Sequence, residues 1–243
     1  MSLADPYLKT HRAKEHLEVL RLEIEMFRES KPYFFIREDD VVNQRHFIRF
    51  MMKKIPDRLP LSVGDICSCL RASLDQLVWC LAVSNSRGRT YPEHTHFPIL
   101  TKPNSKEFRS GTKGVAADAG KIIKSLQPYN AGDDAAIRSH PLWRLNKLCN
   151  IDKHISIPVH GAAGKMRYAQ TFGPGMRITA FDNKGVMSVP LSMKDYMALN
   201  PDVTFDVIFG DPYWKIECDF ACIEHIYEFV ANKVIPGFTR FCP

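Results

Sequence analysis

The chain has 243 residues, of which 45% are apolar and 25% charged, as is typical of a soluble globular protein with a sizeable core. Its net charge of +6 is spread along the sequence. Nucleic-acid-binding proteins usually concentrate Lys and Arg residues on one face, so this charge allows nucleic-acid binding but does not require it. The N-terminus lacks the pattern of a secretory signal, and no apolar run is long enough for a transmembrane helix, so we predict a cytosolic protein without a membrane partner.

The first third of the chain is predicted to form a helix, a hairpin and a second helix. Apolar residues that recur every three or four positions predict a helix over 5–29. Alternating apolar residues predict two antiparallel strands over 32–39 and 44–54. The helix expected over 62–85, with Ser62 as its N-cap, has the broadest apolar face and should lie at the centre of the fold.

The middle of the chain is predicted to alternate between loops and helices. Residues 103–114 have the composition of a loop, and a helix is expected over 115–126. The apolar periodicity over 136–154 predicts another helix. Because proline favours the first turn of a helix, His140-Pro141 is a candidate break within it.

The second half of the chain has a sequence pattern typical of β-strands. Strands are expected at 166–171, 176–181, 186–190, 203–209 and 213–218, and a closing helix is expected at 219–234. A helix-rich part (1–155) followed by a strand-rich part (156–243) predicts a single α+β domain. We expect a central helical core, long flanking helices and a mainly antiparallel sheet.

Arg71 and Asp75 are the first candidate site residues. They lie one helical turn apart and therefore share a face of the central helix. An ordinary ion pair at the edge of the core explains them. Alternatively, Asp75 holds the guanidinium of Arg71 toward a site, where it recognises a phosphate or carboxylate.

A second group of polar residues lies near the end of the helix expected over 136–154. Asn150 and His154 are four residues apart, and Lys153 is adjacent. Cations at this position favour the negative end of the helix dipole, which explains Lys153 and His154 structurally. The functional alternative is that His154 acts as an acid or base while Lys153 stabilises developing charge.

No sequence motif predicts a cofactor or a metal. His94 and His96 form an H-x-H pair, which a solvated loop explains better than a metal site. The seven cysteines contain no C-x-x-C pair, so we expect free thiols in a reduced compartment. The common nucleotide, hydrolase and zinc-protease fingerprints do not occur.

Three segments together resemble a family of uncharacterised bacterial and phage-associated proteins. They are Arg71-Ala-Ser-Leu-Asp75-Gln-Leu-Val-Trp79, Phe97-Pro-Ile99, and His140-Pro-Leu-Trp143 through Asn150-Ile-Asp-Lys-His154. The resemblance covers roughly residues 60–160 and marks these residues without implying an activity. A more distant similarity is to HEPN-type helical domains, many of which are ribonucleases. Those domains carry Arg and His four to six residues apart on one helix, and this sequence has no such spacing at Arg71.

The leading functional hypothesis is a binding or interaction protein with a polar pocket between the two central helices. Arg71 would anchor an anionic small molecule or nucleic acid and Asp75 would orient it, while Asn150, Lys153 and His154 would line the far wall. One alternative is a metal-independent nuclease or phosphodiesterase of a defence or toxin type, with His154 as its acid or base and with Arg71 and Lys153 stabilising phosphate charge. The other alternative is that the five residues form a purely structural network. The sequence predicts no oligomeric state.

Overall fold

The computed structural model describes residues 2–87, 93–167, 186–196 and 202–242. It confirms the α+β class, because helices account for most of the described chain and the strand pairs β1–β2, β2–β4 and β5–β6 of its two small sheets are antiparallel. The chain forms two compact units: unit 1 comprises 1–23, 57–159 and 208–243, and unit 2 comprises 24–56 and 160–207. The boundaries of these units do not coincide with the predicted helix-rich and strand-rich parts of the chain. That the whole chain is a single domain stays a prediction.

The core of unit 1 is built on α2 (Arg58–Asn85), the central helix expected from the sequence. Its apolar stripe, which includes Leu70, Leu74 and Leu77, is fully buried. The helix begins at Arg58 and not after Ser62, because a proline at position 60 is accepted in the first turn of a helix. By length and composition α2 is the one helix of the described chain that could cross a membrane, but 61% of its most apolar window is buried, as in the core helix of a soluble protein.

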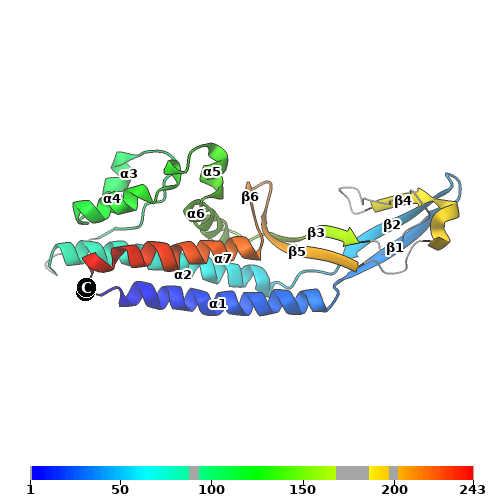
Figure 1. Cartoon of the computed structure of the whole chain (residues 1–243), viewed down its shortest axis with the longest axis horizontal. Helices are drawn as coiled ribbons and strands as arrows, with labels where there is room; N and C mark the ends of the chain where they lie inside the picture. The colour runs from blue at the N-terminus through cyan, green and yellow to red at the C-terminus, as the bar shows by residue number, and fades with distance from the viewer. Residues whose placement is uncertain (1, 88–92, 168–185, 197–201, 243) are drawn as a thin grey trace. The chain divides into compact units, whose positions relative to one another are not determined.

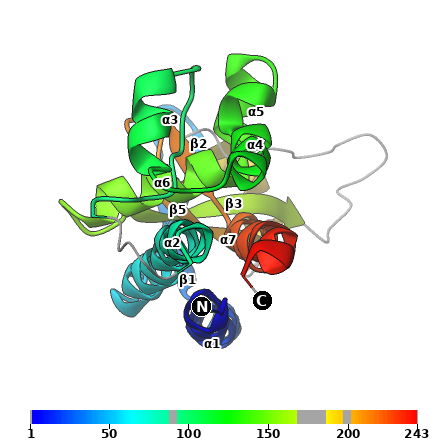
Figure 2. The same ribbon diagram turned by 90° about the vertical axis from the view of Figure 1, so that its left-hand side faces the viewer.

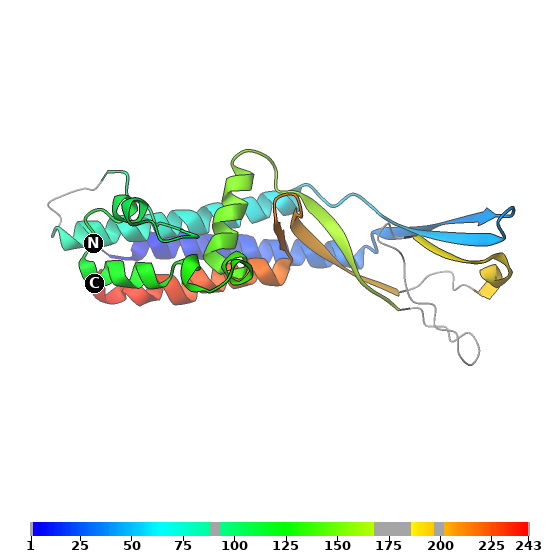
Figure 3. The same ribbon diagram turned by 90° about the horizontal axis from the view of Figure 1, so that it is seen from above.

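Three further helices surround α2: α1 (Ala4–Glu29), α6 (Pro141–Asp152) and α7 (Phe220–Glu228). In Figure 2, which looks along the long helices, the N-terminal part of α1 and α7 lie beside α2. An ion pair of 2.7 Å between Glu23 and Arg58 joins α1 to α2, and another between Arg21 and Glu224 joins α1 to α7. Figure 3 shows α6 crossing α2 at a steep angle. The chain continues past α7 as a π-helical turn and a 3₁₀ helix, Phe229–Val234 and Ile235–Phe241.

The described part of the segment between α2 and α6, which begins again at residue 93, contains three short helices and one 3₁₀ turn. These are α3 (Ser105–Gly111), α4 (Ala117–Ser125), η1 (Pro128–Asn130) and α5 (Asp134–Ser139). The prediction of a loop over 103–114 is wrong at α3. The side chain of Asn104 accepts a hydrogen bond from the backbone N–H of Glu107 at 3.1 Å, and this cap starts the helix. Asn104 and Glu107 form a capping-box pattern in the sequence.

The predicted break at His140-Pro141 is confirmed. α5 ends at Ser139 and α6 begins at Pro141, where the missing N–H of proline costs no helical hydrogen bond. The ring nitrogen Nδ1 of His140 accepts a hydrogen bond from the backbone N–H of Leu142 at 3.2 Å, so His140 caps α6. Burial among its neighbours lowers the pKa of His140, as expected for a neutral capping imidazole.

Unit 2 contains the predicted hairpin, in which β1 (Tyr33–Asp40) and β2 (Arg45–Met52) pair in an antiparallel register. β4 (Val186–Pro190) adds to the free edge of β2, and the 3₁₀ helix η2 (Leu191–Tyr196) follows it. The other sheet has the order β3-β5-β6, from Val159–Arg167, Asp202–Asp211 and Ile216–Cys218. The strand predicted at 176–181 lies outside the described residues, as does most of the one predicted at 166–171.

The contacts of Asp39 in unit 2 predict that this part of the structure responds to acid. Asp39 of β1 accepts hydrogen bonds from Lys194 of η2 and from the buried His46 of β2, and these bonds, with Lys194 the larger cause, lower the pKa of Asp39. A lowered folded-state pKa adds stability above the unfolded pKa of Asp39 and loses it as the pH falls through the folded value. We therefore expect the contact between η2 and the hairpin to loosen below about pH 4. NMR shifts of β1 and β2 across an acid titration would show this change.

A variant separates Asp39 from the other acids of the hairpin. Asp39→Asn should remove most of the pH dependence of these NMR shifts, because the amide does not titrate. Glu38→Gln is the matched control, since Glu38 is 61% exposed and lies 3.8 Å from Arg49. If both variants kept the same acid response, Asp39 would not be its source.

Candidate anion-binding groove

An extended segment, 96–100, crosses the face of α2 and is held there by the Arg71–Asp75 pair. The guanidinium of Arg71 donates to the carboxylate of Asp75 at 2.8 and 3.2 Å, and to the backbone carbonyl of Phe97 at 2.8 Å. Asp75 in turn accepts from the backbone N–H of Phe97 at 2.8 Å. The pair thus satisfies both backbone groups of Phe97, whose side chain is fully buried. We call this arrangement the Phe97 clamp.

A buried glutamine holds the other side of the same segment. Gln127 is 1% exposed. Its side chain accepts from the N–H of Leu100 at 3.0 Å and donates to the carbonyl of Pro98 at 2.9 Å and of Ile123 at 3.0 Å. Side chains of α2 and of the residue that precedes η1 therefore replace the sheet partner that an extended segment normally has. They fix the position of Leu100, from which the chain enters α3.

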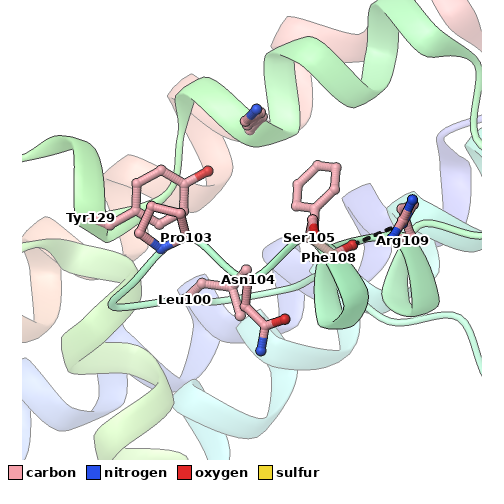
Figure 4. A pocket seen from close by; sticks show the side chains of 8 residues that line it. Leu100, Pro103, Asn104, Ser105, Phe108, Arg109 and Tyr129 are labelled. Atoms are coloured by element: carbon pink, nitrogen blue, oxygen red, sulfur yellow. Dashed lines mark hydrogen bonds between the residues drawn. The ribbon is translucent and has the colours of Figure 1, made fainter.

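Beyond this segment lie two cavities beside α3 and α4, which together we call the α3–α4 groove. The first has a volume of about 260 Å³ and is lined by Leu100, Pro103, Asn104, Ser105, Phe108, Arg109, Lys124 and Tyr129 (Figure 4). The second has a volume of about 400 Å³ and shares Phe108, Arg109 and Lys124 with the first. It continues along residues 112–117 and along Gly120 and Lys121.

The groove carries positive charge. Four cationic residues line it (Arg109, Lys113, Lys121 and Lys124), and none of its described lining residues is acidic. Lys121 is paired with the nearby Asp118 at 2.9 Å, while the guanidinium Nε of Arg109 donates to the carbonyl of Ser105 in its own helix at 3.1 Å. A concave surface with cations of one sign focuses its potential and attracts anions.

The first cavity also has an apolar side. Leu100 is buried and Phe108 and Tyr129 are half-buried, and Figure 4 shows the two aromatic residues at the same pocket. Partial burial raises the pKa of Tyr129, so its hydroxyl keeps its proton at neutral pH and remains a hydrogen-bond donor. The groove therefore combines an aromatic surface with neighbouring cations.

The other predicted site residues lie on an exposed part of the same unit. Asn150, Lys153 and His154 are all exposed at the C-terminal end of α6. The backbone N–H groups of Lys153 and His154 donate to the carbonyls of Cys149 and Ile151, which completes the last turn of the helix. The buried residues of α6 are Pro141, Leu142, Leu145, Leu148, Cys149 and Ile151, whereas Asn150 lies on its exposed side.

One electrostatic link joins α2 to the end of α6. The thiol of Cys149 lies against Cys67 of α2, and a hydrogen bond from Cys67 is the largest cause that lowers the pKa of Cys149. The charges of Arg71 and Lys153 lower it further. Arg71 and Lys153 therefore both lie near this buried sulfur, although Arg71 donates its hydrogen bonds to Asp75 and Phe97.

The H-x-H pair lies just before the clamp. His94 is exposed and His96 half-buried, and the backbone N–H of His96 donates to the carbonyl of Gly111 at 3.0 Å. Within the described residues, no group of three His, Cys, Asp or Glu side chains is placed to hold a metal ion.

No family model matches the chain, and no curated protein or solved structure matches it.

Sequence reasoning missed the groove because no motif marks it. Its lining comes from a connection that the sequence predicts as loop, from α3, from α4 and from η1. One signal was present: Arg109, Lys113, Lys121 and Lys124 fall within sixteen residues. Only the fold of α3 against α4 turns this spacing into one concave surface.

Proposed function

We propose that the protein is a cytosolic binding protein whose α3–α4 groove takes a small anionic ligand with an aromatic or apolar body. The observation that carries the proposal is the joint lining of the groove by an aromatic surface and by Arg109 and Lys124. Ligand pockets are typically concave and mainly apolar, with a few polar groups that fix orientation, and their volumes run from about 300 to 1,000 Å³. The seven free cysteines support a reducing compartment.

The chemistry of the groove favours a mononucleotide-like ligand. An aromatic base can stack on Phe108 or Tyr129, and a phosphate can reach the cations at the shared wall of the two cavities. The anionic ligand expected from the sequence is kept in this proposal, but its site moves from the two central helices to the groove. Arg71 and Asp75 then support the site indirectly, because the Phe97 clamp fixes the segment that leads into it.

The test is calorimetric titration of the full chain with adenosine and guanosine monophosphates. We expect saturable binding by the unmodified protein. The double variant Arg109→Gln/Lys124→Gln should weaken it roughly tenfold or more, because each charged hydrogen bond contributes about 1.5–3 kcal/mol. The matched control is Lys14→Gln, which removes a cation of α1 that is 57% exposed and lies outside the groove. Equal binding by the double variant would contradict the proposal.

A parallel titration with a single-stranded oligonucleotide of about twelve nucleotides separates the two anionic partners expected from the sequence. The proposal predicts that the strand binds no more tightly per site than a mononucleotide. Tight binding of the strand without binding of mononucleotides would indicate a nucleic-acid protein instead. The nuclease alternative stays a prediction, and release of nucleotides from that strand, lost in His154→Ala, would support it.

A further inference from the structure

Cys222 has an unusual partner for a buried thiol. It is the third residue of α7, and its backbone N–H donates to the capping carboxylate of Asp219 at 2.8 Å. The guanidinium Nη1 of Arg144, on α6, lies 2.8 Å from the sulfur of Cys222. A guanidinium that donates to sulfur stabilises the thiolate over the thiol, since the thiolate is the stronger acceptor.

A second thiol lies beside the first. Cys218 ends β6 and is separated from Cys222 by the turn that starts α7. Interaction between the two thiols lowers the pKa of Cys222 and raises that of Cys218. Arg144 also lowers the pKa of Cys222, whereas burial and the carboxylate of Asp219 raise it. Cys218 is 1% exposed and Cys222 is 9% exposed, so Cys222 is the more accessible of the pair.

The two sulfurs therefore differ in role. Arg144 favours the thiolate of Cys222, while the more deeply buried Cys218 favours its protonated form. This is the arrangement of an attacking thiolate with a resolving cysteine, because a sulfenic acid on the first condenses with the second.

We propose that Cys222 and Cys218 form a peroxide-sensitive thiol pair, with Cys222 as the residue that is oxidised first. The thiolate of Cys222 attacks one oxygen of hydrogen peroxide, the O–O bond breaks, and Cys222 becomes a sulfenic acid while hydroxide leaves. The sulfur of Cys218 then attacks the sulfur of Cys222. The S–O bond breaks, the proton of Cys218 leaves with the hydroxyl as water, and a disulfide joins the two residues. Two electrons pass from the sulfurs to one peroxide.

Disulfide formation has a structural consequence at this corner of unit 1. The disulfide sulfur is neutral, so Arg144 loses the negative partner that it has in the reduced protein. α6 and α7 are then no longer joined by this charged contact, and a dithiol reductant restores it. The pair is thus a reversible oxidation site between β6, α6 and α7.

Mass spectrometry of the full chain tests the pair directly. Trypsin cleaves after Lys215 and Lys233, and the resulting peptide contains Cys218 and Cys222 and no other cysteine. After treatment with hydrogen peroxide and alkylation, we expect this peptide without alkyl groups and lighter by two hydrogen atoms. Reduction should return the doubly alkylated form. A peptide that stays doubly alkylated while peptides with other cysteines are oxidised would overturn the proposal.

Two variants assign the roles. Cys218→Ser removes the resolving thiol, so a dimedone adduct on Cys222 should replace the disulfide; the absence of an adduct on Cys222 would contradict the order of steps. Arg144→Gln should slow the oxidation of Cys222 roughly fivefold or more, because less of the thiol is ionised. Arg138→Gln is its control, since Arg138 pairs with Asp134 at 3.1 Å and is not bonded to Cys222. Equal rates in both arginine variants would remove Arg144 from the mechanism.

Discussion

Asp75→Asn is expected to lower the free energy of unfolding by about 2 kcal/mol, although it keeps the size of the side chain. The carboxylate accepts from two nitrogens of Arg71 and from the N–H of Phe97. An amide has one oxygen, so the variant cannot satisfy all three donors. The guanidinium of Arg71, whose side chain is 19% exposed, is left without its counter-charge. Urea denaturation followed by circular dichroism measures the loss.

Asp118→Asn is the matched control for this experiment. Asp118 also pairs with a cation on its own helix, Lys121, but both side chains are more than 70% exposed and the backbone of no distant segment depends on them. Exposed pairs of this kind contribute from zero to about 1 kcal/mol, so the control should change stability little. Equal losses in the two variants would mean that the Phe97 clamp adds nothing beyond an ordinary surface pair.

A double variant distinguishes a structural clamp from a ligand site. Arg71→Met combined with Asp75→Leu removes both charges together, and it should cost less than the sum of the single changes, because neither variant group leaves an unpaired charge. If the groove is the site, this variant should still bind mononucleotides, with an affinity lowered only through the loosened segment that leads into the groove. Loss of binding with retained stability would instead favour the anion site predicted between the two central helices.

The helices could be predicted because their signal is local. The apolar periodicity of α1 and α2, and the proline between α5 and α6, follow from residues only a few positions apart. The helix α3 was not predicted because its seven residues are too few to show a clear apolar periodicity. The N-cap residue Asn104 is the stronger signal for α3. A short helix is better predicted from its capping residue than from its apolar periodicity.

The candidate site could be predicted only in part. The spacing of Arg71 and Asp75 places them on one face, as the structure confirms, but their bond to Phe97 joins positions more than twenty residues apart and no periodicity encodes it. The sequence of α6 also indicates which side of this helix is buried and which is exposed. Leu142, Leu145, Leu148 and Cys149 define the buried stripe, and Asn150 falls on the other side of the helix.

Gly210→Ala is expected to be the most damaging of the single substitutions considered. Gly210 is the penultimate residue of β5, pairs with Glu217 of β6 and has a φ of +96°, where a side chain is strained. A Cβ atom there would lie 2.3 Å from the carbonyl oxygen of Ile216, and a backbone atom of a paired strand cannot rotate away. Strain and overlap together should cost about 3 kcal/mol or more. The loss would appear as a lower urea midpoint or as insoluble protein.

Two other glycines separate the two causes. Gly132 has a φ of +117° but nothing within 4 Å of its Cβ position, so Gly132→Ala measures backbone strain alone, about 1 kcal/mol. Gly237 has neither constraint, and Gly237→Ala should be neutral or slightly stabilising. If Gly210→Ala cost no more than Gly132→Ala, the β5–β6 pairing would tolerate movement at Ile216. That pairing also places Cys218 opposite Phe209, so such tolerance would let Cys218 shift relative to Cys222 and would weaken the preorganisation of the thiol pair.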